Sequence, residues 1–93
     1  EAENSVFMAL GHPVRQSIVM MLARGALPVQ VISDQLPISR PAVSRHLKVL
    51  SKAGLLSVTR HGTMNIYALK QEGIMVADRF LERLWDGALA AIQ

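Results

Sequence analysis

The sequence has no cysteine among its 93 residues, which excludes disulfides, thiolate metal sites and thiol-based redox sensing. No apolar run reaches the roughly 18 residues that a membrane span needs, and no signal peptide is evident. Hydrophobic residues still make up 51% of this short chain, so we expect a partner chain to cover some apolar surface. These features favour one cytoplasmic domain over residues 1–93 with no membrane partner.

Acidic residues are absent from residues 39–70, although seven occur elsewhere in the chain. This segment has a formal charge of +6, from Arg40, Arg45, Lys48, Lys52, Arg60 and Lys70. The rest of the chain has four arginines against the seven carboxylates, a formal charge of −3, which gives the total of +3. A basic block inside an otherwise acidic domain is typical of a site that binds a polyanion.

Catalytic motifs are also absent. The sequence has no glycine-rich phosphate loop and no set of Ser, His and Asp placed as a proton relay. The three histidines, His12, His46 and His61, show no metal-ligand spacing such as i, i+4 on one helix. We therefore expect no catalytic residue, no cofactor and no metal site.

Residues 39–54 predict a helix with one apolar and one cationic face. Ser39 is a suitable N-cap and Gly54 a suitable stop, while Val43, Leu47 and Leu50 recur at i, i+4 and i+7. The opposite face presents Pro41, Arg45, Lys48 and Lys52, with Ser44 at its edge. Such a face suits a groove lined with phosphates, although a solvated surface helix would show the same pattern.

Three shorter helices are predicted before the basic one, over residues 4–10, 13–23 and 28–36. Only residues 37–39 separate the third of these from the basic helix. Two helices joined this tightly have to cross steeply, so residues 28–54 predict a helix-turn-helix unit. In such a unit the second helix enters the major groove of DNA.

After Gly54 the apolar pattern changes to the alternation typical of strands. Residues 55–60 and 64–69 predict two strands joined by residues 60–63, where Gly62 can adopt a positive φ. A hairpin in this position forms a wing over residues 55–70, with Arg60 and His61 at its tip. Arg60 would reach a flanking phosphate or the minor groove; an ordinary exposed turn is the alternative.

Residues 71–92 predict a long terminal helix with a broad apolar band. A helix this apolar at the end of a small domain needs more cover than the domain core supplies, and a second copy of the chain is the simplest cover. Together with residues 1–10, residues 71–93 are therefore expected to form a homodimer interface. Its expected members are Val6, Phe7, Leu10, Phe80, Leu81, Leu84, Trp85 and Leu89.

Residues 7–69 resemble the ArsR/SmtB winged-helix repressors of bacteria and archaea. The matching stretches are residues 9–15 with Ile18, 39–50, 53–56, 60–62 and 67–69. Each stretch alone is weak evidence, whereas their order and spacing together are specific. The resemblance implies a mainly α fold with a small β-hairpin, in the order α-α-α-α-β-β-α, that dimerises through its terminal helices.

The resemblance also implies a transcriptional repressor that binds a palindromic operator as a homodimer. Two recognition helices about 34 Å apart would enter successive major grooves of double-stranded DNA. By helical angle His46 lies beside the buried stripe, where a phosphate contact and a packed, hydrogen-bonded histidine both stay open. The expected DNA-binding residues are Ser39, Arg40, Pro41, Ala42, Ser44, Arg45, His46, Lys48, Arg60 and His61.

The chain departs from the metal-sensing members of that family. Some of these use cysteines on the helix before the recognition helix, and others use carboxylates and histidines on the C-terminal helix. Residues 71–92 offer four carboxylates but no histidine. A metal-responsive repressor with a non-cysteine site and a winged-helix protein-interaction module remain the alternative functions. The inducer is unknown, and a small apolar ligand, a partner protein or no inducer at all would each fit the sequence.

Overall fold

The computed structural model describes residues 1–92, which form five helices and one three-stranded antiparallel sheet. In chain order the elements are α1 (Ala2–Leu10), α2 (Pro13–Leu22), β1 (Leu27–Pro28), α3 (Val29–Asp34), α4 (Arg40–Lys52), β2 (Leu56–His61), β3 (Met64–Leu69) and α5 (Gln71–Ile92). Gln93, part of the predicted terminal segment 71–93, lies outside the described residues. The predicted helices are confirmed, although α1 begins two residues earlier and α3 ends at Asp34 rather than at Leu36.

One apolar core joins the first four helices to the start of the wing. The predicted inner stripe of α4, Val43, Leu47 and Leu50, lies in this core and is confirmed. The other buried apolar side chains are Val6, Ala9, Ile18, Leu22, Ile32, Leu55 and Leu56. Val6 thus differs from its expected place at a dimer interface, because with 1% exposure it packs inside its own chain and has no surface left for a partner.

The sheet has the order β1-β3-β2, so the predicted hairpin gains a third, two-residue strand. Leu27 pairs with Tyr67 and Pro28 with Ile66, while β2 and β3 pair from Leu56↔Leu69 to His61↔Met64. That last pair leaves Gly62 and Thr63 as a two-residue turn. Gly62 has φ +62°, which suits the first central position of a hairpin turn that keeps the twist of the strands.

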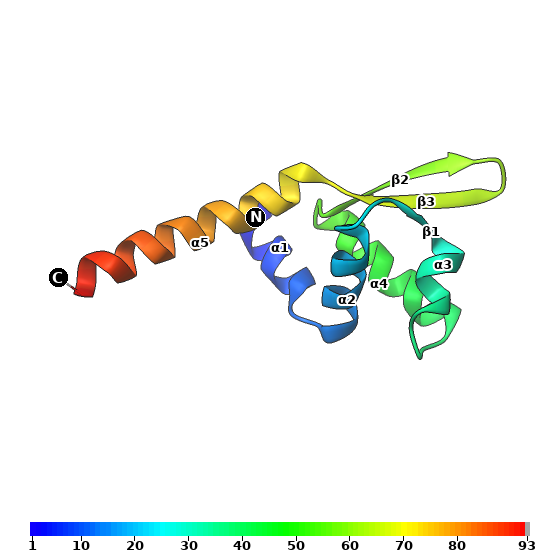
Figure 1. The fold of residues 1–93 in the computed structure, drawn as a ribbon, viewed down its shortest axis with the longest axis horizontal. Helices are drawn as coiled ribbons and strands as arrows, with labels where there is room; N and C mark the ends of the chain where they lie inside the picture. The colour runs from blue at the N-terminus through cyan, green and yellow to red at the C-terminus, as the bar shows by residue number, and fades with distance from the viewer. Residues whose placement is uncertain (93) are drawn as a thin grey trace.

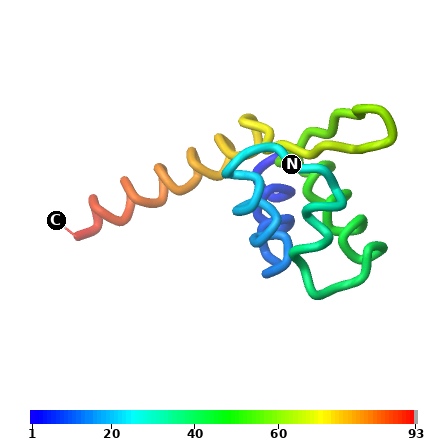
Figure 2. Tube along the Cα trace, turned by 45° about the vertical axis from the view of Figure 1, so that its right-hand side comes forward, coloured from blue at the N-terminus to red at the C-terminus, as the bar shows by residue number. Residues whose placement is uncertain are grey.

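Helix α5 runs out of the domain rather than back across it, as both views show (Figure 1, Figure 2). The molecule measures 55 × 25 × 24 Å with a radius of gyration of 15.0 Å, against about 12 Å for a compact chain of this length. Every described residue from Leu81 onward is exposed. The second half of α5 therefore adds almost nothing to the core of its own chain.

Candidate nucleic-acid interface

Helix α4 begins as predicted, with Ser39 as its N-cap. The Ser39 hydroxyl accepts a hydrogen bond from the Ala42 backbone N–H at 3.3 Å, and Pro41 occupies the first turn, where its missing N–H costs nothing. The inner face packs on the core, which turns the cationic face outward. The residues expected on that face are all exposed: Pro41, Ser44, Arg45, Lys48 and Lys52. Of the other α4 residues expected to meet DNA at the helix start, Ser39 and Arg40 are exposed and Ala42 is half-buried.

The cations of this face are not neutralised by the chain itself. Among residues 1–92 the single ion pair joins Glu3 to Arg83, at 2.7 Å, far along the sequence from α4. Arg40, Arg45, Lys48 and Lys52 are therefore free of carboxylate partners within that range. Three unpaired cations on the outer face and a fourth, Arg40, at the helix start produce a strong local positive potential.

The wing presents its two predicted tip residues, Arg60 and His61, to solvent. Arg60 pairs across the hairpin with Asn65, and its Nε donates a hydrogen bond to the Gly62 carbonyl oxygen at 3.0 Å. This bond holds the Nε end of the Arg60 guanidinium against the turn. The wing thus carries one positioned cation beyond those of α4.

His46 lies apart from the exposed residues of α4, because it is half-buried against α1 and α2. The Arg15 guanidinium donates a hydrogen bond from Nη1 to His46 Nδ1 at 3.2 Å, and the rings of His12 and His46 lie 4.5 Å apart between centroids. Of the two alternatives left open by the sequence, the structure shows the packed and hydrogen-bonded histidine. Burial lowers the pKa of His46, and the nearby His12, Arg15 and Arg45 lower it further.

Arg15 was not singled out as a functional residue by the sequence analysis, yet it joins three helices. Besides His46 on α4, it donates to two carbonyl oxygens in the last turn of α1, to Ala9 through Nε at 2.6 Å and to Met8 through Nη2 at 3.3 Å. The Met8 carbonyl also accepts the Gly11 backbone N–H at 3.2 Å, and Arg15 adds a side-chain donor to it and to the Ala9 carbonyl, so Arg15 serves as a C-terminal cap of α1. Its place three residues before the buried Ile18 on α2 was the available sign that it faces inward.

His12 is the N-cap of α2, because its Nδ1 accepts a hydrogen bond from the Val14 backbone N–H at 3.1 Å. His46 likewise accepts at Nδ1, from Arg15, so its ring proton lies on Nε2. His61 stands alone at the wing tip. Among residues 1–92, no three His, Asp or Glu side chains come together as a ligand set.

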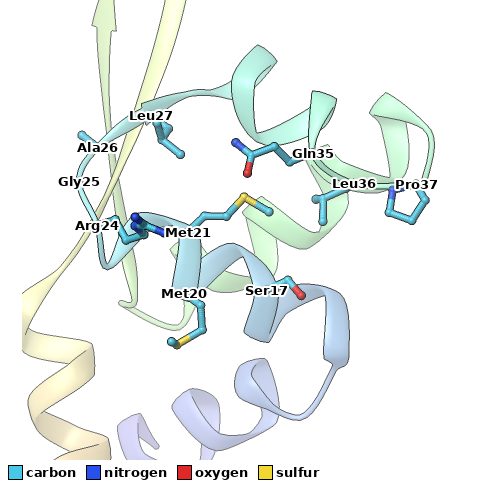
Figure 3. A pocket seen from close by; sticks show the side chains of 10 residues that line it. All are labelled: Ser17, Met20, Met21, Arg24, Gly25, Ala26, Leu27, Gln35, Leu36 and Pro37. Atoms are coloured by element: carbon cyan, nitrogen blue, oxygen red, sulfur yellow. The ribbon is translucent and has the colours of Figure 1, made fainter.

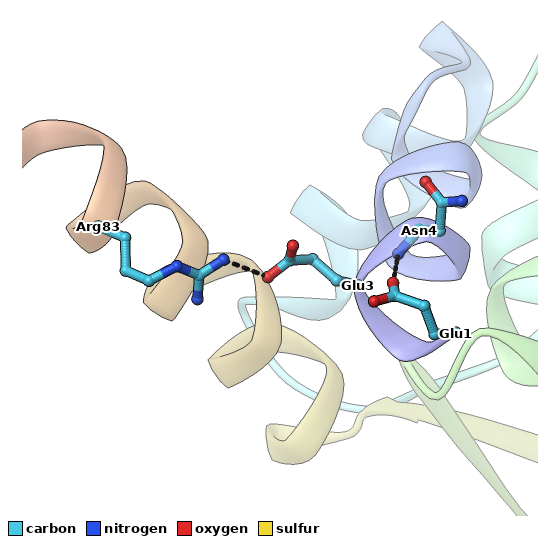
Figure 4. Close-up of polar contacts among 4 residues, drawn as sticks. All are labelled: Glu1, Glu3, Asn4 and Arg83. Atoms are coloured by element: carbon cyan, nitrogen blue, oxygen red, sulfur yellow. Dashed lines mark hydrogen bonds and ion pairs between the residues drawn. The ribbon is translucent and has the colours of Figure 1, made fainter. Parts of the chain in front are cut away.

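A second surface of interest lies where α1 packs on the first half of α5. The rings of Phe7 and Phe80 meet edge to face at 4.9 Å. The Arg83 guanidinium lies 5.6 Å from the centre of the Phe80 ring and pairs with Glu3 (Figure 4). Phe7, Leu10 and Phe80 are thus half-buried within the chain. Beyond this contact Leu81, Leu84, Trp85 and Leu89 are exposed, with Trp85 at 65%. Exposed large apolar side chains grouped along one helix are typical of an interaction surface.

None of the helices within residues 1–92 combines the length and apolar character that a membrane crossing requires.

Comparison with known proteins relates the chain to DNA-binding regulators. The family model described as a helix-turn-helix domain matches residues 10–59, more than half of the chain. The chain is 42% identical to the HTH-type transcriptional regulator Rv2034 of Mycobacterium tuberculosis, over 89% of this chain and 78% of the relative. It is 35% identical to the transcriptional repressor SdpR of Bacillus subtilis, over 71% and 73% of the two chains.

Solved structures agree with the observed architecture. An ArsR-like transcriptional regulator from Rhodococcus sp. RHA1 superposes with a TM-score of 0.80 at 33% identity, over 98% of this chain and 89% of that one. The homodimeric winged helix-turn-helix DNA-binding domain of Mb0332 from Mycobacterium bovis superposes with a TM-score of 0.74 at 24% identity, over 95% and 82%. The order of elements, the wing and these similarities together show that the chain belongs to the ArsR/SmtB family of winged helix-turn-helix transcriptional regulators.

Proposed function

We propose that this chain is a transcriptional repressor that binds a palindromic operator as a homodimer, acting in the cytoplasm. The observation that supports this most directly is the outer face of α4, which is cationic, exposed and unpaired, continued by Arg60 on the wing. Among the relatives, the protein from Bacillus subtilis is named as a repressor.

The proposal assigns a role to each residue expected to bind DNA. Arg45 and Lys48, in the middle of α4, contact base edges or phosphates in the major groove. Arg40 and Ser44 contact the adjacent backbone, with Ser39, Pro41 and Ala42 close to the DNA at the helix start. Arg60 contacts a flanking phosphate or the minor groove, with His61 beside it. His46 is assigned instead to holding α4 in place through Arg15.

The dimer is proposed to form through the exposed strip of α5, Leu81, Leu84, Trp85 and Leu89. Phe7, Leu10 and Phe80 are half-buried in their own chain, and in this proposal the exposed part of each contacts the partner. The solved domain from Mycobacterium bovis is described as homodimeric, which agrees with a dimer for this fold. Two copies would place two α4 helices on one side, as a palindrome requires.

The experiment is a titration of a labelled duplex from the region upstream of the gene with the purified protein. A scrambled duplex of equal length and composition is the control, and both are titrated at several salt concentrations. If half of the eight cations contributed by two copies of Arg40, Arg45, Lys48 and Arg60 contact phosphates, log K should fall against log salt with a slope of about −4. Preference for the native duplex supports the proposal; equal, weak binding to both duplexes contradicts it.

A further inference from the structure

A groove of about 790 Å³ opens between α2 and the end of α3, and none of the residues expected to bind DNA lines it. Its walls are residues of α2, of the loop and strand β1 that follow it, and of the turn that precedes α4 (Figure 3). They are Ser17, Met20, Met21, Arg24, Gly25, Ala26, Leu27, Gln35, Leu36 and Pro37. The volume falls within the range of about 300–1,000 Å³ that small-molecule sites occupy.

The lining has the composition of a site for an amphipathic molecule. Met21 extends from α2 into the space between the two helices, with Leu27 and Leu36 on its two sides (Figure 3). Met20, at the rim, is 68% exposed. Thioether and aliphatic side chains adapt to apolar ligands of varied shape, and methionine does so most readily.

Arg24 is the one ionisable residue among the ten that line the groove. It lies at the end near Gly25 and Leu27, opposite Leu36 and Pro37 (Figure 3). Within residues 1–92 its guanidinium has no carboxylate partner. A planar guanidinium at one end of an apolar groove matches a carboxylate on an apolar body, because it can donate two parallel hydrogen bonds.

We propose that this groove binds a small effector with an apolar body and one carboxylate, held by Met21, Leu27 and Leu36 and oriented by Arg24. The proposal rests on the proposed function, since it assigns the regulation of the same DNA-binding domain. It also places the effector away from the exposed strip of α5.

The position of the groove explains how an occupant acts on α4. Its far wall, Gln35–Pro37, is followed directly by Ile38 and by Ser39, the N-cap of α4. A ligand that fills the groove holds this turn at one distance from α2. The turn sets the position at which α4 starts. In the proposal the effector and the operator each favour a different position of α4, so each weakens binding of the other by the same factor.

The test uses decanoate as the probe, below its micelle concentration, and the full chain labelled with nitrogen-15. Decan-1-ol, which has the same chain length without the charge, is the matched ligand control. Arg24→Gln removes the proposed carboxylate partner, and Arg79→Gln removes an exposed cation of α5 as the control variant. Amide shifts locate the probe, and operator titrations with and without decanoate measure its effect.

We expect decanoate to shift amides of residues 17–27, 35 and 36, and Arg24→Gln to weaken decanoate binding at least tenfold while decan-1-ol binding stays unchanged. Arg79→Gln should behave as the parent chain. Saturating decanoate should weaken operator binding by fivefold or more.

Three results would overturn the inference: shifts centred on α5 around Trp85, equal decanoate affinity in the Arg24→Gln variant, or groove binding with unchanged operator affinity. The amide shifts are measured without DNA, which separates the two proposals. Operator binding without groove binding refutes the effector site alone, whereas groove binding without operator binding refutes the proposed function.

Discussion

Arg15 on α2 donates a hydrogen bond to the Nδ1 atom of His46 on α4, 3.2 Å away. This bond joins α2 to the helix that is proposed to enter DNA. The same guanidinium holds the last turn of α1, which packs on α5. One side chain therefore connects the two terminal helices with α4. The protonation state of His46 matters to this connection, because a protonated ring has no acceptor left for Arg15.

The stability of the protein should fall as the pH falls below about 6.5, the ordinary pKa of histidine. Burial and the adjacent His12, Arg15 and Arg45 lower the pKa of His46 in the folded state. Between that lowered pKa and 6.5 the unfolded chain binds more protons than the folded chain. The free energy of unfolding therefore rises as the pH rises across this window and decreases as the pH falls through it. Urea unfolding at steps from pH 7.5 to 5.5 measures the slope.

The variant His46→Asn should flatten this slope, since the Asn amide oxygen still accepts from Arg15 and does not titrate. His61→Asn at the exposed wing tip is the control and should leave the slope as it is in the parent chain. An unchanged slope in His46→Asn would assign the pH dependence to other groups.

Replacing Arg15 by Gln should lower the free energy of unfolding by about 1–3 kcal/mol, because the shorter side chain cannot reach Ala9, Met8 and His46 together. Chemical unfolding at pH 7.5 measures the loss. Arg24→Gln, in the turn just after α2, removes an exposed arginine and should stay within about 0.5 kcal/mol of the parent chain. Equal stability of the two variants would contradict the capping role.

Gly73→Ala should destabilise the protein although alanine is the better helix former. A Cβ at Gly73 would meet the Gly54 carbonyl, with the carbonyl carbon at 2.8 Å and the Leu55 Cα at 3.0 Å. Both are backbone atoms that cannot turn aside, so we expect a loss above about 1 kcal/mol. Gly87 in the same helix has nothing within 4 Å, and Gly87→Ala should stabilise by up to about 1 kcal/mol. Thermal unfolding of both variants tests the pair; a stabilising Gly73→Ala would mean that α5 does not start against Gly54.

Arg45→Ala should weaken operator binding by about 1–3 kcal/mol and relax the preference for one base, if Arg45 contacts a base edge. A uniform loss over all sequences with a shallower salt slope would indicate a phosphate contact instead. Arg79→Ala on α5 is the matched loss of one cation and should bind as the parent chain does. Unchanged binding in Arg45→Ala would remove this residue from the interface.

Trp85→Asp should produce folded monomers that bind DNA weakly. Trp85 is 65% exposed, so the chain's own core does not depend on it, while a carboxylate there would be buried unpaired in the proposed dimer. Sedimentation of this variant tests the interface. The control is Arg79→Asp, which places a carboxylate on the polar side of α5. A dimer that survives Trp85→Asp would place the interface elsewhere.

The helices and the wing were predictable because their determinants are local. Ser39, Pro41 and Gly54 define the ends of α4, and the spacing of Val43, Leu47 and Leu50 defines its inner face. Strand β1 was not predicted, since Leu27 and Pro28 form a strand only by pairing with residues nearly forty positions later. A two-residue strand has no periodicity of its own.

The functional residues show the same difference between what local sequence determines and what tertiary packing determines. Val6 and Leu81 belong to similar apolar patterns, yet tertiary packing buries the first and leaves the second at 53% exposure. The partner of His46 is 31 positions away in sequence, so helical angle alone left its role open. The DNA contacts and the dimer contacts remain predictions, because they depend on molecules that the sequence of one chain does not contain.

Because the second half of α5 is exposed, operator binding by the proposed repressor should depend on the concentration of the chain. If its apolar strip is covered only by a second copy, folding of that half depends on the concentration of the chain. Operator occupancy would then follow the square of the monomer concentration at low copy number. A cell that halves its supply of this chain, by dilution at division for example, would lose about three quarters of its dimers in that range.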